Sequence, residues 1–123
     1  MAMRNPALGE LLARARRLVR RAHNAGGELL RYEDLVLDPA ARTARRGSRA
    51  LELTRTEFEL LELLLRNAGR VVTRHEILTQ VWGFDFGASS NSLNVYIGYI
   101  RRKLGEPALV QTVRGVGYTL RKQ

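Results

Sequence analysis

The chain has 123 residues, no cysteine and a formal net charge of +9 at pH 7. This length suits a single domain that buries its own hydrophobic core. A sequence without cysteine excludes a disulfide framework, a thiol nucleophile and a Cys-based zinc site. No apolar run approaches the roughly 20 residues of a membrane span, and the first residues lack the apolar stretch of a signal peptide. We therefore expect a cytoplasmic protein with no membrane partner.

The positive charge is concentrated toward the two ends of the chain. Residues 1–28 hold six Arg against two Glu, and residues 29–86 hold nine Arg against nine acids. Residues 87–123 hold six Lys or Arg against a single acid, Glu106. Such an excess indicates an anionic partner, and its position on a predicted helix and hairpin favours nucleic acid.

The first predicted helix spans residues 6–22, and a Gly-rich linker follows at residues 23–28. One side of this helix is apolar, and the other carries Arg14, Arg17, Arg20 and Arg21. A polybasic amphipathic helix can lie on an anionic membrane or bind a calmodulin-like partner. We favour a packing face whose partner lies outside this chain.

The spacing of apolar residues changes to a period of two after Leu29. This alternation predicts a strand over residues 30–37, which ends at a turn formed by Asp38 and Pro39. Residues 42–44 and 50–53 predict two further short strands on either side of a Gly-Ser turn. Together these segments predict a small antiparallel sheet.

Two helices with clear start signals follow the predicted sheet. Thr54 and Glu57 have the spacing of a capping box, and so do Thr73 and Glu76. The first of these helices is expected to end before Gly69, and the second is expected to end at Trp82.

A third helix is predicted over residues 90–104, capped by Ser90 or Asn91 and ending before Gly105. One face is apolar and should pack inward, with Leu93, Ile97, Ile100 and Leu104. The opposite face carries Asn91, Ser92, Val95, Gly98, Tyr99 and Arg102. This mixture of amide, hydroxyl, methyl, aromatic and cationic groups suits the base edges of a DNA major groove.

A hairpin completes the chain, with strands predicted at residues 109–113 and 118–121 around a turn that contains Arg114. The order of sheet, three helices and hairpin predicts an α+β fold of the winged helix-turn-helix type. In that fold the third helix enters the major groove, and the hairpin wing touches the backbone or the minor groove.

Four blocks of the sequence resemble OmpR/PhoB-type response-regulator effector domains. They are LTRTEFELLELLL from Leu53, VTRHEILTQVWG from Val72, VYIGYIRRKL from Val95 and TVRGVGY from Thr112. The resemblance covers about residues 29–122, and the expected DNA-binding domain is therefore 29–123. The block LGELLARARRL from Leu8 resembles the last helix of the receiver domain that normally precedes such an effector domain.

The resemblance implies a transcription regulator of a two-component system. Family members bind direct repeats of DNA as head-to-tail pairs after a histidine kinase phosphorylates an aspartate of the receiver. This sequence holds no receiver sheet and no acidic pocket, so we expect a fragment of a longer regulator whose kinase acts only through the receiver. The loop at residues 83–89 resembles the segment that contacts RNA polymerase in activators, but its sequence does not separate activator from repressor.

The resemblance and the helical wheel together define the candidate DNA-binding residues. On the third helix they are Asn91, Ser92, Val95, Tyr96, Tyr99, Arg101 and Arg102. On the wing they are Thr112, Arg114, Gly115, Gly117 and Tyr118, and Trp82 joins them from the end of the second helix. Asn91 and Ser92 could instead be helix caps, and Arg101 could form an intramolecular ion pair. The sequence departs from common family members at Asn91 and Gly98, where Arg is frequent, and at Asn94, where an acid is usual.

No constellation in the sequence indicates an enzyme, a metal site or a cofactor. His23 and His75 are far apart, and Glu57 is explained by helix capping. Glu59 and Glu62 are expected on a solvated helix face. The main alternative function is a winged helix that binds a protein through the same face instead of DNA.

Overall fold

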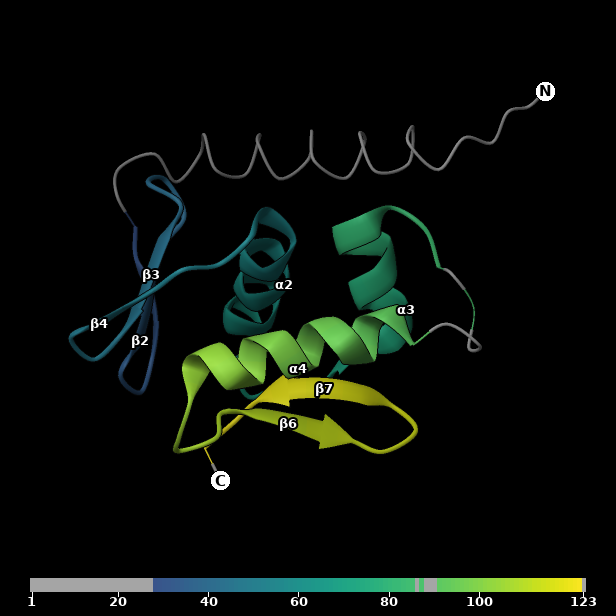
Figure 1. Cartoon of the computed structure of the whole chain (residues 1–123). Coiled ribbons are helices and arrows are strands. Elements are labelled where there is room, and N and C mark those ends of the chain that lie inside the picture. Colours follow the sequence, from purple (N-terminus) through teal and green to yellow (C-terminus); the bar gives the residue numbers. More distant parts are fainter. Residues whose placement is uncertain (1–27, 86, 88–90, 123) are drawn as a thin grey trace.

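The structure of the chain is a computed structural model that describes residues 28–85, 87 and 91–122. The predicted helix at residues 6–22 lies outside the described residues. The predicted linker also lies outside them, except for residue 28. Within the described part, the predicted order of sheet, three helices and hairpin is confirmed. Figure 1 shows the four-stranded sheet on the left, the helices in the middle and the hairpin below them.

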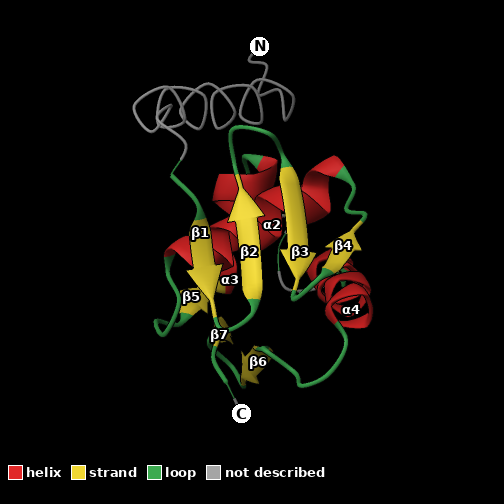
Figure 2. Ribbon diagram, turned by 90° about the vertical axis from the view of Figure 1, so that its left-hand side faces the viewer, coloured by secondary structure: helices red, strands yellow, loops and turns green. Residues whose placement is uncertain are grey.

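The first sheet is antiparallel with strand order β1-β2-β3-β4 (Figure 2). Its strands are β1 (Leu30–Tyr32), β2 (Leu35–Asp38), β3 (Thr43–Arg46) and β4 (Arg49–Leu51). The single strand predicted over residues 30–37 is wrong, because a turn at Glu33 and Asp34 splits it in two. Glu33 has a positive φ of 53°, and Gly47 N donates to Asp34 O at 2.8 Å. The chain therefore turns through a left-handed Glu33 where the sequence has neither Gly nor Pro, and the bond to Gly47 continues the β2–β3 pairing beyond Leu35 and Arg46.

Helix α2 (Arg55–Arg66) covers one face of this sheet, as Figure 2 shows. The strands bury Leu35, Leu37, Ala44 and Leu51 in the same core cluster as the apolar residues of α2. The predicted capping box at the start of α2 is confirmed: Glu57 N donates to Thr54 Oγ1 at 3.2 Å, and Thr54 N donates to Glu57 Oε1 at 3.0 Å.

The expectation of solvated carboxylates on α2 is wrong, because Glu59 and Glu62 are each only 4% exposed. A buried carboxylate is tolerated when cations and hydrogen bonds accompany it. Glu62 accepts a hydrogen bond from Arg66 Nε at 3.1 Å. Glu59 lies 3.9 Å from an Arg42 nitrogen and 4.0 Å from an Arg55 nitrogen. These acids are structural ion-pair partners.

The second predicted helix forms as α3 (Arg74–Ile77), which continues as one wider turn, η1 (Leu78–Trp82). Its capping box is also confirmed, because Glu76 N donates to Thr73 Oγ1 and Thr73 N donates to Glu76 Oε1. The helix ends at Gly83, whose φ of 90° is a left-handed conformation that glycine adopts without strain.

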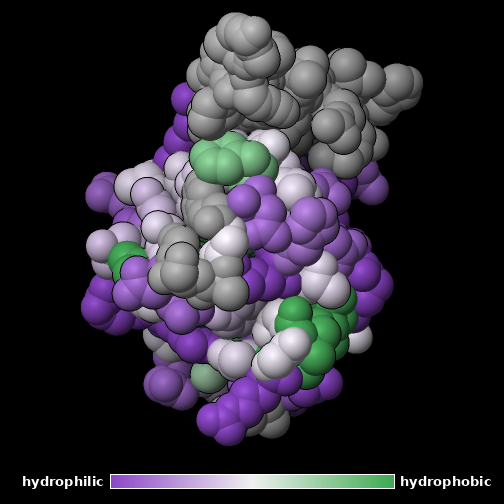
Figure 3. All heavy atoms as spheres, turned by 90° about the vertical axis from the view of Figure 1, so that its right-hand side faces the viewer, coloured by the Kyte–Doolittle hydropathy of each residue, from purple (hydrophilic) through white to green (hydrophobic). Residues whose placement is uncertain are grey.

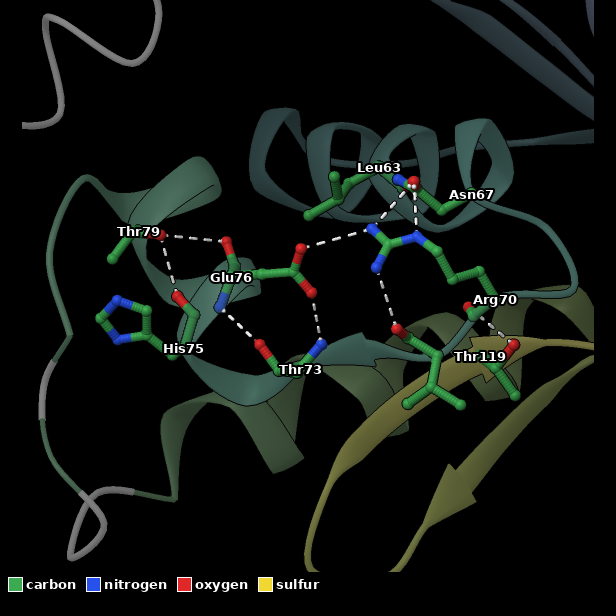
Figure 4. Close-up of polar contacts among 9 residues, drawn as sticks. Leu63, Asn67, Arg70, Thr73, His75, Glu76, Thr79 and Thr119 are labelled. Carbon is green, nitrogen blue, oxygen red and sulfur yellow. Dashed lines mark hydrogen bonds and ion pairs between the residues drawn. The ribbon is translucent and has the colours of Figure 1, made fainter.

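A second sheet has strand order β5-β7-β6. The hairpin strands β6 (Val110–Val113) and β7 (Gly117–Leu120) were predicted, whereas β5 (Val72–Thr73) was not. Two residues are too few to show a strand period. Arg70 supports this junction from the side (Figure 4): it donates to Asn67 Oδ1 at the end of α2 and to Glu76 at the start of α3, and its carbonyl accepts from Thr119 on β7.

Helix α4 (Ser92–Leu104) lies across the front of the molecule, with the hairpin directly below it (Figure 1). The four residues predicted to face inward are all buried in the core, with at most 1% of their surface exposed: Leu93, Ile97, Ile100 and Leu104. The opposite face of α4 is thereby fixed toward the outside.

Candidate nucleic-acid interface

The outer face of α4 carries the predicted set of side chains. Val95 and Tyr99 are each 39% exposed, which is unusual for large apolar side chains in this domain. Asn91 occupies the N-cap position, but its side chain makes no capping hydrogen bond. The predicted cap position is therefore confirmed, but the exposed Asn91 side chain does not provide the capping hydrogen bond.

Three aromatic rings and one guanidinium group continue along this region. Tyr96 packs edge-on against Trp82 at a centroid distance of 5.4 Å and against Tyr99 at 5.6 Å. The guanidinium carbon of Arg102 lies 5.4 Å from the Tyr99 ring centroid. Trp82 and Tyr96 are half-buried and pack against the core, while Tyr99 and Arg102 are exposed. The outermost members of this row are the ones available to a ligand.

The turn of the hairpin, which we call the wing turn, consists of residues 114–116. Gly115 has a φ of 75°, and Val116 N donates to Val113 O at 2.9 Å to close the turn. Arg114 is exposed and makes no hydrogen bond or ion pair with another residue of the described chain. Figure 3 shows the side of the molecule toward which the wing turn points; its described surface is mostly hydrophilic, with a strongly hydrophobic patch at lower right and a paler one near the top. Val116, in the wing turn, is 49% exposed.

Gly117, the first residue of β7, is required by a close backbone approach. A Cβ atom at this position would collide with the carbonyl oxygen of Val72 and lie 2.8 Å from the Thr73 Cα atom. The register pairs Thr73 with Gly117, so the collision falls on the β5–β7 ladder. The glycine allows the wing to pack directly on the start of α3.

Helix α4 and the wing are joined by three hydrogen bonds that we call the helix–wing bonds. Arg101 donates from Nε to Val110 O at 3.1 Å and from Nη2 to Thr112 Oγ1 at 2.7 Å. The Tyr118 hydroxyl donates to Asn94 Oδ1 at 2.5 Å. Arg101 therefore makes hydrogen bonds to the wing in place of the ion pair that was considered. These bonds hold the two candidate DNA-binding elements in one relative position.

The C-terminal end of α4 is held by two arginines of the first sheet. Arg46 Nη1 donates to Leu104 O at 3.2 Å and to Gly105 O at 3.1 Å, and its Nε donates to Asp34 Oδ1 at 2.9 Å. Arg49 donates to Lys103 O at 2.9 Å and to Leu104 O at 2.7 Å. The last carbonyls of a helix lack intrahelical partners and carry partial negative charge, so cations stabilise them. Sequence patterns missed both residues, because arginines on short strands resemble solvent-facing positions.

Lys103, in the last turn of α4, joins this helix to the start of α2. Its Nζ donates to Glu57 Oε1 at 2.6 Å and to Glu52 O at 2.8 Å. Burial by itself raises the pKa of the Glu57 carboxyl, but hydrogen bonds from Lys103 and from the Thr54 backbone outweigh burial and leave the pKa below its ordinary value of 4.5.

The lowered pKa of Glu57 gives an expected dependence of stability on pH. A carboxyl whose pKa is depressed in the folded state stabilises the fold above its unfolded pKa, and this contribution disappears as the pH falls through the folded pKa. We expect Glu57→Gln to lower the Tm at about pH 7 and to have a smaller effect at about pH 3. Circular-dichroism melts at both pH values test this. Glu52→Gln, an exposed neighbour, is the control, and an equal loss at both pH values would contradict the assigned cause.

Two contacts attach the loop after η1 to the start of α3. Arg74 Nη2 donates to Gly87 O at 3.0 Å, and His75 Nδ1 lies 2.8 Å from Asp85 Oδ2. The hydrogen bond from His75, supported by the Gly87 backbone amide, lowers the pKa of Asp85. Residues 86 and 88–90 of this loop lie outside the described residues.

Two further classes of site are absent from the described residues. The described helices include none with the length and apolar character needed to cross a membrane. The same residues contain no group of three or more His, Cys, Asp or Glu side chains arranged to hold a metal ion.

Comparison with known proteins gives a consistent family. The sequence profile described as "Transcriptional regulatory protein, C terminal" matches residues 48–120. The response regulator MprA of Mycobacterium tuberculosis is 56% identical over 122 residues, which cover 94% of this chain and 53% of MprA. The chain therefore spans about half the length of the curated relatives it matches.

Solved structures agree with the winged-helix assignment. The DNA-binding domain of CpxR from E. coli superimposes with a TM-score of 0.72 at 33% identity, over 77% of this chain and 97% of that domain. The DNA-binding domain of Klebsiella pneumoniae RstA, determined in complex with the RstA box, gives a TM-score of 0.71 at 28% identity, over 76% of this chain and 97% of that domain. The predicted fold class is confirmed.

Proposed function

The chain belongs to the OmpR/PhoB family of response-regulator effector domains, and we propose that it binds double-stranded DNA sequence-specifically and thereby regulates transcription. One observation carries the proposal. An exposed polar and aromatic helix face and an exposed arginine turn are fixed beside each other by the helix–wing bonds. The RstA domain, which shares this fold, is known in complex with a DNA element.

In this proposal α4 lies in the major groove. Asn91, Ser92 and Val95, near its N-terminal end, face the base edges, where an amide suits adenine and a methyl group suits thymine. Tyr99 and Arg102 contact the base edges or the adjacent phosphates. Tyr96 and Trp82 support this face from behind. The indole of Trp82 also approaches the DNA phosphate backbone from the edge of the helix.

The wing supplies contacts outside the major groove. Arg114 enters or borders the minor groove, where narrowness concentrates negative potential. Gly115 permits close approach of the wing turn to the DNA backbone. Gly117 and Tyr118 are buried and support the wing from inside, because Gly117 faces β5 and the Tyr118 hydroxyl donates to Asn94. The Thr112 oxygen already accepts from Arg101, so its hydroxyl hydrogen is available to a phosphate. Arg101 positions the wing through its hydrogen bonds to Val110 and Thr112, and it also places a positive charge near the DNA phosphates.

Arg114 is expected to contribute affinity more than sequence preference. Arg114→Ala should weaken DNA binding about tenfold at about 0.1 M salt and reduce the slope of log K against log salt by about 0.9. Fluorescence anisotropy across a salt series measures both quantities. Arg31→Ala removes an exposed arginine from β1 of the other sheet and should change neither; an equal effect of both variants would contradict a specific wing contact.

The remaining partners follow from family membership and belong to the same proposal. We propose that a longer regulator in the cytoplasm, with a receiver domain ahead of residue 23, receives a phosphoryl group from a histidine kinase. Two copies would then bind direct repeats head to tail. The loop at residues 83–89 is proposed to face RNA polymerase.

The experiment that tests the proposed function is selection from a random duplex pool. The purified chain should enrich a motif of about 6–8 base pairs, and the enrichment should survive an increase in salt that removes non-specific binding. Binding without an enriched motif would support the alternative of a protein-binding winged helix with a merely basic surface.

A further inference from the structure

Gly98 lies in the middle of α4, where glycine is unfavourable and serves no internal purpose. Glycine weakens a helix interior relative to alanine, because the unfolded chain has more backbone freedom to lose. A Cβ atom placed on Gly98 would meet no atom within 4 Å. This differs from Gly117, where a Cβ would strike β5. An external group that approaches α4 closely would explain the missing side chain.

The residues one helical turn from Gly98 surround this open position with complementary groups. Residues three and four apart are neighbours on a helix surface, so Val95, Asn94 and Arg102 adjoin it. Val95 presents an exposed isopropyl group. Asn94 accepts the Tyr118 hydroxyl through Oδ1, so its amide nitrogen is the donor that remains. Arg102 adds a cation on the C-terminal side, beside the Tyr99 ring.

We propose that the open position at Gly98 receives the major-groove edge of a thymine, and that Gly98 determines specificity because it has no side chain. Thymine presents a C5-methyl group next to an O4 acceptor. In this arrangement Val95 contacts the methyl group and the Asn94 amide donates to O4. Cytosine offers an amino donor where O4 would be, and guanine offers acceptors without a methyl group. The inference rests on the proposed function.

The first test separates helix stability from DNA binding. Gly98→Ala adds helix propensity in open space, so the Tm should rise by about 4 °C. The affinity for the duplex selected by the unmodified chain should nevertheless fall about fivefold, and Gly98→Leu should bind more weakly still. A substitution that stabilises the fold and weakens binding cannot act through misfolding. Thr56→Ala on α2, away from this face, is the matched control and should leave the affinity unchanged.

The second test identifies the base. Each thymine of the selected duplex is replaced in turn by deoxyuridine, which lacks only the methyl group. At one position the replacement should weaken binding of the unmodified chain about threefold, the value of one buried methyl group. Val95→Ala and Gly98→Leu should bind the thymine and uracil duplexes equally at that position.

The outcomes separate this inference from the function on which it rests. If the unmodified chain enriches a motif but Gly98→Ala keeps the same affinity and base preference, the role of Gly98 is overturned and the proposed function stands. If no thymine-to-uracil replacement weakens binding of the unmodified chain more than that of Val95→Ala and Gly98→Leu, the assignment of the base is overturned. If no motif is enriched at all, the proposed function and this inference both fail.

Discussion

Replacing Gly117 with alanine is expected to destabilise the domain by about 3 kcal/mol or more. The new Cβ would overlap the Val72 carbonyl oxygen, which belongs to the backbone of β5 and cannot move aside as a flexible side chain can. Relief requires β7 to separate from β5 at the Thr73–Gly117 pair. Calorimetry should therefore show a Tm lowered by at least 10 °C, on the basis of about 4–8 °C per kcal/mol for a domain of this size.

Gly98→Ala is a matched comparison for Gly117→Ala. Both changes add one methyl group to a glycine, but the Cβ at Gly98 meets open space. Hydrogen exchange at the amides of β5 should be faster in Gly117→Ala and unchanged in Gly98→Ala. Equal Tm values for the two variants would contradict the close packing of the wing on the start of α3.

Arg46→Ala is expected to lower the free energy of unfolding by about 2–3 kcal/mol and to weaken DNA binding as well. Arg46 is only 5% exposed, and it connects Asp34 of the β1–β2 turn with the carbonyls of Leu104 and Gly105. Its removal leaves the Gly105 carbonyl without this donor and loosens the end of the proposed recognition helix. Thermal melts and anisotropy titrations measure the two effects.

Two substitutions sharpen the interpretation of Arg46. Arg45→Ala removes the adjacent arginine of the same strand, which is exposed and donates to Gly47 O at 3.0 Å. Its effect should be within about 0.5 kcal/mol. Arg46→Lys retains the charge but loses the planar donor group that reaches both carbonyls and Asp34, so partial recovery is expected. A Tm for Arg46→Ala equal to that of Arg45→Ala would show that the sheet does not hold α4.

The elements that were predicted correctly have signals within a few neighbouring residues. Thr54 and Glu57 form the capping box that marks the start of α2, and Thr73 and Glu76 form the one that marks the start of α3. The buried stripe of α4 has helical spacing, so the wheel also placed Val95 and Tyr99 outside. These elements can be predicted from the sequence because the interactions that define them join residues close together in the chain.

The features that were missed depend on contacts between distant parts of the chain. Strand β5 exists because Val72 and Thr73 meet β7, more than 40 residues later in the sequence. Glu59 is buried although its surroundings in the sequence are those of a solvated helix, and its ion-pair partner Arg42 lies outside that helix. Arg46 is separated by 58 residues from the Leu104 carbonyl that it binds. Period and propensity carry no information about such pairings.

The most direct test of the proposed interface is an NMR titration of the ¹⁵N-labelled chain with the selected duplex. The proposed function predicts that the largest amide shifts cluster on the outer face of α4 and on the wing turn, at Val95, Gly98, Tyr99, Arg114 and Gly115. The strands β1–β4 should shift little, and a duplex with a scrambled motif should give weak shifts without this cluster. Shifts concentrated on the first sheet, or equal for both duplexes, would contradict recognition of DNA by α4 and the wing.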